Sequence, residues 1–85
     1  MIEKTIKVKL SEGLEFGPTT IFVQVANKFK SRIYVLMDNK RVNAKSIMGM
    51  LTLGMVEGEE VVVTAEGEDE EAAIAEIEKF LSAED

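Results

Sequence analysis

Hydrophobic and polar positions alternate along several short stretches of the chain. A period of two puts every second side chain on the same face, so each stretch predicts a β-strand with one buried face. The predicted strands with this alternation cover residues 2–10, 32–37 and 41–43, and the β-branched run of Val61, Val62, Val63 and Thr64 predicts a fourth strand over residues 60–66. Lys4 interrupts the otherwise apolar face of the first strand. The pair Asp38-Asn39 predicts a tight turn that joins the second and third strands as a hairpin.

Two longer stretches have apolar residues at steps of one, three and four, and this spacing predicts amphipathic helices. The first covers residues 19–30, just after Pro18, and its apolar stripe consists of Ile21, Phe22, Val25, Ala26 and Phe29. The second follows the acidic run 68–71, and its stripe consists of Ala73, Ile74, Ile77, Phe80 and Leu81. Negative charge suits a helix N-terminus, and the run lacks the loop spacing of a cation site, so we interpret it as a helix start.

A third, shorter helix is predicted between these two. Ser46 has the character of an N-cap, and Gly54 that of a stop. Met50 and Leu53 are expected to face inward more than Met48. The resulting order β, α, β, β, α, β, α predicts a single α+β domain over residues 1–85. The expected architecture is a two-layer, open-faced β-sandwich, with a four-stranded antiparallel sheet and three helices on one face.

Composition narrows the functional classes. The 85 residues include no cysteine and no histidine, which removes disulfides, thiolate chemistry and the commonest general acid/base and metal ligand. The net charge of −6 disfavours direct binding to nucleic acid. The N-terminus shows neither a secretory signal nor a membrane span. We therefore expect a cytoplasmic, non-catalytic protein without a metal or cofactor.

Two segments carry a more specific pattern: Gly-Leu-Glu-Phe-Gly-Pro at residues 13–18 and Val-Asn-Ala-Lys-Ser-Ile-Met-Gly at residues 42–49. Together they resemble the HPr family, the phosphocarrier proteins of the bacterial sugar phosphotransferase system, whose fold has the element order predicted above. In that family the first segment carries a histidine that receives phosphate. Here Glu15 occupies its position, and Gly17 replaces an arginine that helps to hold the phosphate. The resemblance therefore implies no histidine phosphocarrier activity.

The second segment implies phosphorylation of Ser46, because in Gram-positive members the bifunctional HPr kinase/phosphorylase modifies this serine. A lost histidine with a kept serine resembles the Crh group, which acts in carbon catabolite repression, although the usual substitute there is Gln. The implied partners are that kinase and CcpA, a DNA-binding regulator of the LacI type for which the phosphorylated protein is a corepressor. The residues expected to bind partners are Leu14, Glu15, Gly17, Lys45, Ser46, Ile47, Met48 and Leu51.

Several alternatives stay open. Ser46 at a helix start is also consistent with a plain cap, and the apolar residues after it with ordinary core. Glu15 is a solvated loop residue, a fixed charge in place of phosphohistidine, or a carboxylate that itself accepts phosphate. A carrier that uses Glu15 and an HPr-like module that binds a metabolic enzyme are thus rival functions. The protein is a monomer or a strand-swapped homodimer.

Overall fold

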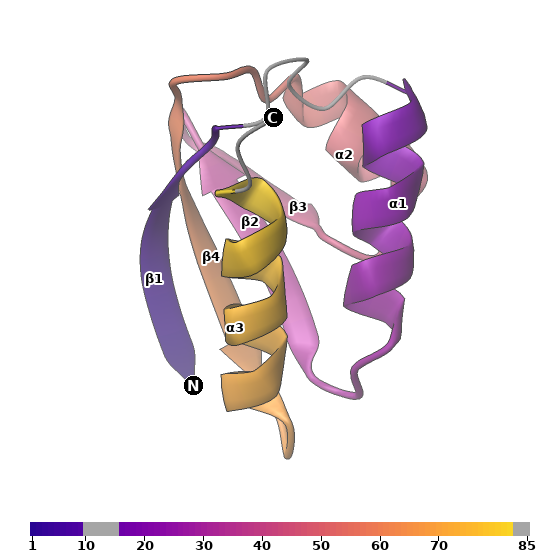
Figure 1. The fold of residues 1–85 in the computed structure, drawn as a ribbon, viewed down its shortest axis with the longest axis vertical. Helices are drawn as coiled ribbons and strands as arrows, with labels where there is room; N and C mark the ends of the chain where they lie inside the picture. The colour runs from indigo at the N-terminus through magenta and orange to yellow at the C-terminus, as the bar shows by residue number, and fades with distance from the viewer. Residues whose placement is uncertain (10–15, 83–85) are drawn as a thin grey trace.

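The structure is a computed structural model that describes residues 1–9 and 16–82. Its elements are β1 (Ile2–Lys7), α1 (Phe16–Asn27), β2 (Arg32–Met37), β3 (Lys40–Asn43), α2 (Ile47–Leu53), β4 (Glu60–Glu66) and α3 (Glu70–Leu81). The four strands form one antiparallel sheet in the order β1-β4-β2-β3. All three helices lie on the same face of that sheet (Figure 1). The predicted order of elements and the two-layer α+β architecture are therefore confirmed.

The core lies between the sheet and the helices. Strands β2 and β4 provide its floor with Ile33, Val35, Met37, Val61, Val63 and Ala65, all of them buried. The register places Ile33 opposite Ala65 and Val35 opposite Val63, so the two buried rows lie side by side. Helices α1 and α3 cover the opposite side of the core. Phe22 of α1 and Phe80 of α3 contact each other there, with their ring centroids 5.9 Å apart.

The polar interruption of β1 has a structural reason. Lys4 pairs with Val63 and so belongs to the inward face, but β1 is an edge strand. Its ammonium reaches Glu78 of α3, with 2.6 Å between Nζ and Oε1. Both side chains keep more than a third of their surface exposed, so the pair adds at most about 1 kcal/mol. Lys4 thus closes the rim of the core without an uncompensated buried charge.

The hairpin between β2 and β3 has the predicted turn. Asp38 and Asn39 both adopt positive φ, 50° and 69°, as a two-residue turn with left-handed central residues requires. The residues that tolerate this conformation are mainly glycine, asparagine and aspartate. The alternating pattern of β2 and the two turn residues therefore fix this hairpin locally.

The bounds and buried side of α1 differ from the prediction. The helix runs over Phe16–Asn27 rather than over residues 19–30. Its buried residues are Thr19, Phe22, Val23 and Ala26, while the predicted stripe residue Ile21 is 51% exposed. Positions 19, 22, 23 and 26 follow the steps of three and four that keep side chains on one helical face. Ile21 lies about 100° away from Phe22 around the axis, outside that face.

The last predicted strand and helix are confirmed, and β1 is shorter than expected. It ends at Lys7, yet Val8 continues the backbone pairing through bonds with Glu59 and Gly58. Leu10, predicted as the last apolar residue of the strand, lies outside the described residues. Within the described ranges, no helix has the length and apolar character needed to cross a membrane.

Candidate functional site

The candidate site is built at the turn that leads from β3 into α2. Asn43 shapes this turn twice: its side-chain oxygen accepts a hydrogen bond from the Lys45 N–H at 2.8 Å, and its carbonyl accepts one from the Ser46 N–H at 3.0 Å. Ser46 then has extended backbone angles, φ −108° and ψ 118°, just before the helix. Its hydroxyl oxygen accepts a hydrogen bond from the Gly49 N–H at 3.1 Å. Ser46 is therefore the N-cap of α2, as predicted.

The hydroxyl of Ser46 keeps chemical capacity beyond this cap. Ser46 is only half-buried. Across residues 1–9 and 16–82, its side chain makes one hydrogen bond, and in it the oxygen accepts. The proton and a second lone pair of the hydroxyl stay available for other partners. The oxygen can therefore act as an acceptor of a phosphoryl group when an enzyme supplies the base and the donor.

Glycine at position 49 keeps the space beside the Ser46 hydroxyl open. A Cβ added at Gly49 would lie 3.4 Å from the hydroxyl oxygen and 3.4 Å from Cβ of Val42. Both distances correspond to ordinary van der Waals contact, so an alanine there would touch the serine and the strand beneath it.

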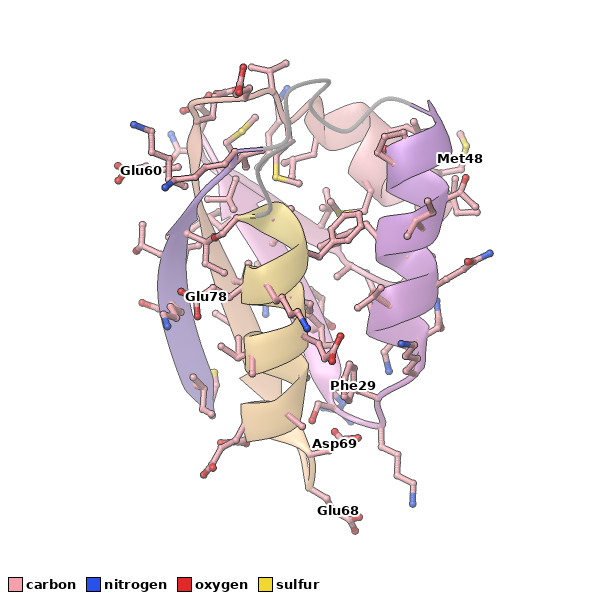
Figure 2. All side chains as sticks on the ribbon, in the orientation of Figure 1. Phe29, Met48, Glu60, Glu68, Asp69 and Glu78 are labelled. Carbon is pink, nitrogen blue, oxygen red and sulfur yellow. The ribbon has the colours of Figure 1, made fainter. Side chains whose placement is uncertain are left out.

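Three apolar side chains follow Ser46 on the outside of α2. Ile47 is 40%, Met48 74% and Leu51 38% exposed; we call these three residues the α2 apolar surface. Figure 2 shows Met48 at the outer edge of the molecule, beside α1. Met50 and Leu53 are buried in the core. The prediction that Met50 and Leu53 face inward more than Met48 is therefore confirmed.

Lys45 has an additional bond that its position beside Ser46 does not reveal. Its ammonium donates to the backbone carbonyl of Phe29 at 2.7 Å, just beyond the end of α1. The Asn27 amide donates to the carbonyl of Lys45 at 3.4 Å and to that of Val23 at 2.9 Å. Positive charge is favourable at the C-terminal end of a helix. Lys45 therefore connects the end of α1 to the start of α2, and this connection helps to fix the position of Ser46.

The remaining predicted partner-binding residues belong to the segment before α1 and to its first turn. Gly17 lies in the first turn of α1. Leu14 and Glu15 lie outside the described residues, so the three interpretations of Glu15 stay predictions. Two further apolar residues, Ile21 on α1 and Val56 after α2, are more than half exposed and were not predicted. Among the described residues, no group of three or more acidic side chains could hold a metal ion.

The clearest electrostatic perturbation lies away from Ser46, at the start of α3. The Asp69 carboxylate accepts hydrogen bonds from the Ser31 hydroxyl at 2.5 Å, the Lys30 N–H at 2.8 Å and the Ser31 N–H at 3.0 Å. These bonds, that of the Ser31 hydroxyl first, lower the pKa of Asp69. The pKa of Glu70 is also lowered, mainly because its side chain accepts a bond from the Gly67 N–H. The acidic run therefore includes a structural clasp that the charge pattern alone did not predict.

The whole chain resembles proteins of known kind. A family model described as the phosphotransferase system HPr component phosphorylation site matches residues 2–83. The HPr-like protein Crh of Halalkalibacterium halodurans is 43% identical over 84 residues, which are 99% of this chain and 100% of that protein. The crystal structure of a phosphocarrier protein HPr from Bacillus anthracis is 39% identical and superposes with a TM-score of 0.92, over 94% of this chain and 95% of that one.

A further similar structure is that of Crh from Bacillus subtilis, for which domain swapping in an intertwined dimer is described. It is 40% identical and superposes with a TM-score of 0.79, over 100% of this chain and 98% of that one. The similar proteins therefore include both a phosphocarrier and Crh proteins, and the similarity extends over nearly the full length.

Proposed function

The chain belongs to the HPr family of the bacterial phosphotransferase system, and we propose that it is a non-catalytic, regulatory member switched by phosphorylation of Ser46. The observation that carries this proposal is the half-buried Ser46, whose hydroxyl caps α2 and which lies directly before the exposed α2 apolar surface. A carrier of phosphohistidine is not part of the proposal, because the chain contains no histidine.

Phosphorylation at Ser46 changes the surface more than the fold. A phosphate adds about −1.5 to −2 charges and three acceptor oxygens. The cap lies at the surface, so these oxygens reach solvent while the buried Met50 and Leu53 keep their places beneath the helix. The modified protein then offers a dianion next to three apolar side chains. A partner that carries arginine beside an apolar pocket is complementary to that combination.

The proposed partners are two. The first is HPr kinase/phosphorylase, which would phosphorylate Ser46 and also remove the phosphate. The second is a CcpA-type regulator of the LacI class, which would bind the phosphorylated form as its corepressor in carbon catabolite repression. The net charge of −6 fits this division, because the regulator would supply the DNA contacts. A kinase that uses ATP and a DNA-binding regulator both work in the cytoplasm, so the proposal places the protein there.

Lys45 has a positioning role in this proposal. Its bond to the Phe29 carbonyl fixes the end of α1 against the start of α2, and a partner that contacts both helices then meets a preorganised surface. Leu14, Glu15 and Gly17 would contribute the α1 side of the contact. Gly17 offers no cation for the phosphate, so in this proposal the guanidinium groups that bind the phosphate come from the partner.

The proposed assembly is a monomer that can also exchange β1 between two chains. The strand-swapped Crh of Bacillus subtilis supports this possibility. In this chain β1 lies at the edge of the sheet and pairs with β4 alone. An edge strand with one neighbour can be replaced by the same strand of a second copy without any change in its pairing.

The test of the proposed function is phosphorylation of the purified protein. With ATP and HPr kinase/phosphorylase, label is expected on Ser46 and should be lost in Ser46→Ala, with Ser82→Ala as a matched serine control. Label on Ser46→Ala, or none on the natural sequence, would contradict the proposal.

The rival function, a carrier that uses Glu15, is favoured by the similarity to phosphocarriers. It is tested in parallel with phosphoenolpyruvate and the general phosphotransferase enzyme. Acid- and base-labile label that disappears in Glu15→Gln would establish the carrier. We expect no such label, because acyl phosphate formation needs electrophilic help and Gly17 supplies none.

A further inference from the structure

The five methionines of the chain fall into two sets of very different exposure. Met50 is fully buried, Met55 is 2% and Met37 8% exposed, whereas Met1 and Met48 are each 74% exposed. The two exposed residues lie in different places. Met1 is at the start of β1, while Met48 is the most exposed member of the α2 apolar surface, two residues after Ser46. Exposure thus singles out one methionine at the candidate site and one away from it.

We propose that Met48 is a site of reversible oxidation, in which hydrogen peroxide converts its thioether into the sulfoxide and so prevents docking at the α2 apolar surface. The proposal rests on the function proposed above and adds a second control to the same site. Where Ser46 phosphorylation adds the charge that a partner recognises, oxidation of Met48 removes the apolar contact beside it.

The chemistry is a two-electron oxygen transfer. The Met48 sulfur attacks one oxygen of hydrogen peroxide, a sulfur–oxygen bond forms, and the oxygen–oxygen bond breaks. The other oxygen leaves as water after proton transfer, so sulfur is oxidised by two electrons and peroxide is reduced. Methionine sulfoxide reductases reverse the step with a dithiol, which becomes a disulfide while the sulfoxide oxygen leaves as water.

The consequence follows from what the sulfoxide does to this surface. A flexible apolar side chain becomes polar, and a partner that covers it must then bury that polar group without a matching donor. The fold should stay unchanged. Among the described residues, the one bond of Met48 outside the helical ladder is made by its backbone carbonyl, which accepts from the Thr52 hydroxyl at 2.8 Å. The cap bond of Ser46 involves Gly49 and not the Met48 side chain.

The first experiment measures selectivity on the full chain. The folded protein is treated with hydrogen peroxide, and peptide mapping by mass spectrometry follows each methionine. Met48 and Met1 should oxidise at similar rates, at least tenfold faster than Met37, Met50 and Met55, and the difference should disappear in denaturant. Oxidation of Met48 no faster than that of the buried three would overturn the proposal.

The second experiment measures the consequence in a Met1→Leu variant, released from a cleavable N-terminal fusion, in which Met48 is the one exposed methionine among the described residues. The rate of Ser46 labelling by HPr kinase/phosphorylase with ATP is compared before and after peroxide treatment. Oxidation should lower kcat/KM on the order of tenfold, since a buried methionine contributes about that factor or more. Treatment with both methionine sulfoxide reductases, one for each sulfoxide epimer, should restore the rate, and the midpoint of thermal unfolding should stay unchanged throughout.

Two variants separate the proposal from its alternatives. Met48→Gln, a polar side chain of similar length, should be slow without peroxide, and Met48→Leu in the Met1→Leu background should lose its sensitivity to peroxide. An unchanged rate after complete oxidation of Met48 would overturn this proposal while the proposed function stands. If the unoxidised protein were never labelled at Ser46, the proposed function would fail and the docking role of Met48 with it.

Discussion

Two helices of this protein begin with a small polar residue, but the two residues use their side chains differently. Ser46 bonds within its own helix, where its hydroxyl oxygen accepts from the Gly49 N–H. Asp69 makes no side-chain bond to its own helix and instead binds Lys30 and Ser31, 38 or more residues away. The start of α2 is thus closed locally, whereas the start of α3 holds a distant loop.

The two side chains also differ in how many of their hydrogen-bonding positions are occupied within the fold. The carboxylate of Asp69 accepts three hydrogen bonds and ties the loop after α1 to the start of α3 (Figure 2). The hydroxyl of Ser46 accepts one bond and lies beside an exposed apolar surface. Asp69 therefore contributes mainly to stability, whereas the proposed role of Ser46 is contact with partners. Substitutions at the two helix starts should therefore differ in what they damage.

The largest loss of stability is expected for Asp69→Ala. Ser31 is fully buried, and the substitution removes the acceptor of both its N–H and its hydroxyl. A buried donor left without a partner is more costly than a hydrogen bond lost at the surface. The free energy of unfolding, measured in urea, should fall further than for Gly67→Ala or Ser46→Ala. Glu68→Ala, at the exposed neighbouring position, is the control, and equal effects of Asp69→Ala and this control would contradict the clasp.

Gly67→Ala should disturb the same clasp from the other side. An added Cβ would lie 2.7 Å from both Cα and the hydroxyl oxygen of Ser31, closer than real Cβ atoms approach backbone. The loop must shift, and overpacking of this kind costs about 1–3 kcal/mol. The midpoint of thermal unfolding reports the loss, with Glu68→Ala again as reference. A midpoint within a degree of the reference would show that Ser31 moves away freely.

Ser46→Ala should cost less, about 1 kcal/mol, which is typical of a lost N-cap. Ser46→Asp keeps an acceptor for the Gly49 N–H and should recover most of this stability. Urea unfolding of the three proteins checks the order. An alanine variant as stable as the natural protein would mean that the Gly49 bond contributes nothing, and Ser46 would then be a surface residue without a structural role.

The mildest way to sharpen the contrast is to lower the pH. Asp69 and Glu70 have lowered pKa values in the folded protein, so their contribution is complete above the unfolded values of about 4. It is lost as the pH falls through the lower folded values, since the unfolded state then binds more protons. Unfolding free energies measured from pH 5 to pH 2 should decline, and less steeply for Asp69→Ala. Parallel curves for the two proteins would contradict this assignment.

Much of the fold could be predicted because its signals are local. The alternation of β2, the turn residues Asp38 and Asn39, and the cap and stop of α2 at Ser46 and Gly54 depend on near neighbours. The stripe of α1 was partly wrong for a physical reason. Ile21, Phe22, Val23 and Val25 form an almost continuous apolar arc, so two stripes about 100° apart fit the sequence, and contact with the sheet decides between them.

The site could be predicted only where it is continuous in sequence. Helical spacing predicted that Met50 and Leu53 face inward more than Met48, and the structure confirms this. The bond from Lys45 to the Phe29 carbonyl and those from Asp69 to the Ser31 loop join residues 16 and 38 or 39 positions apart. Neither the spacing nor the charge of the residues identifies which distant residue each side chain binds, because tertiary packing alone brings the two together.

The most direct test of the central claim is calorimetric titration of a CcpA-type regulator with this protein, with and without phosphate on Ser46. The account predicts binding by the phosphorylated form and at least tenfold weaker binding by the unmodified form and by Ser46→Ala carried through the same kinase reaction. Equal affinity of the phosphorylated and unmodified proteins for the regulator would contradict it.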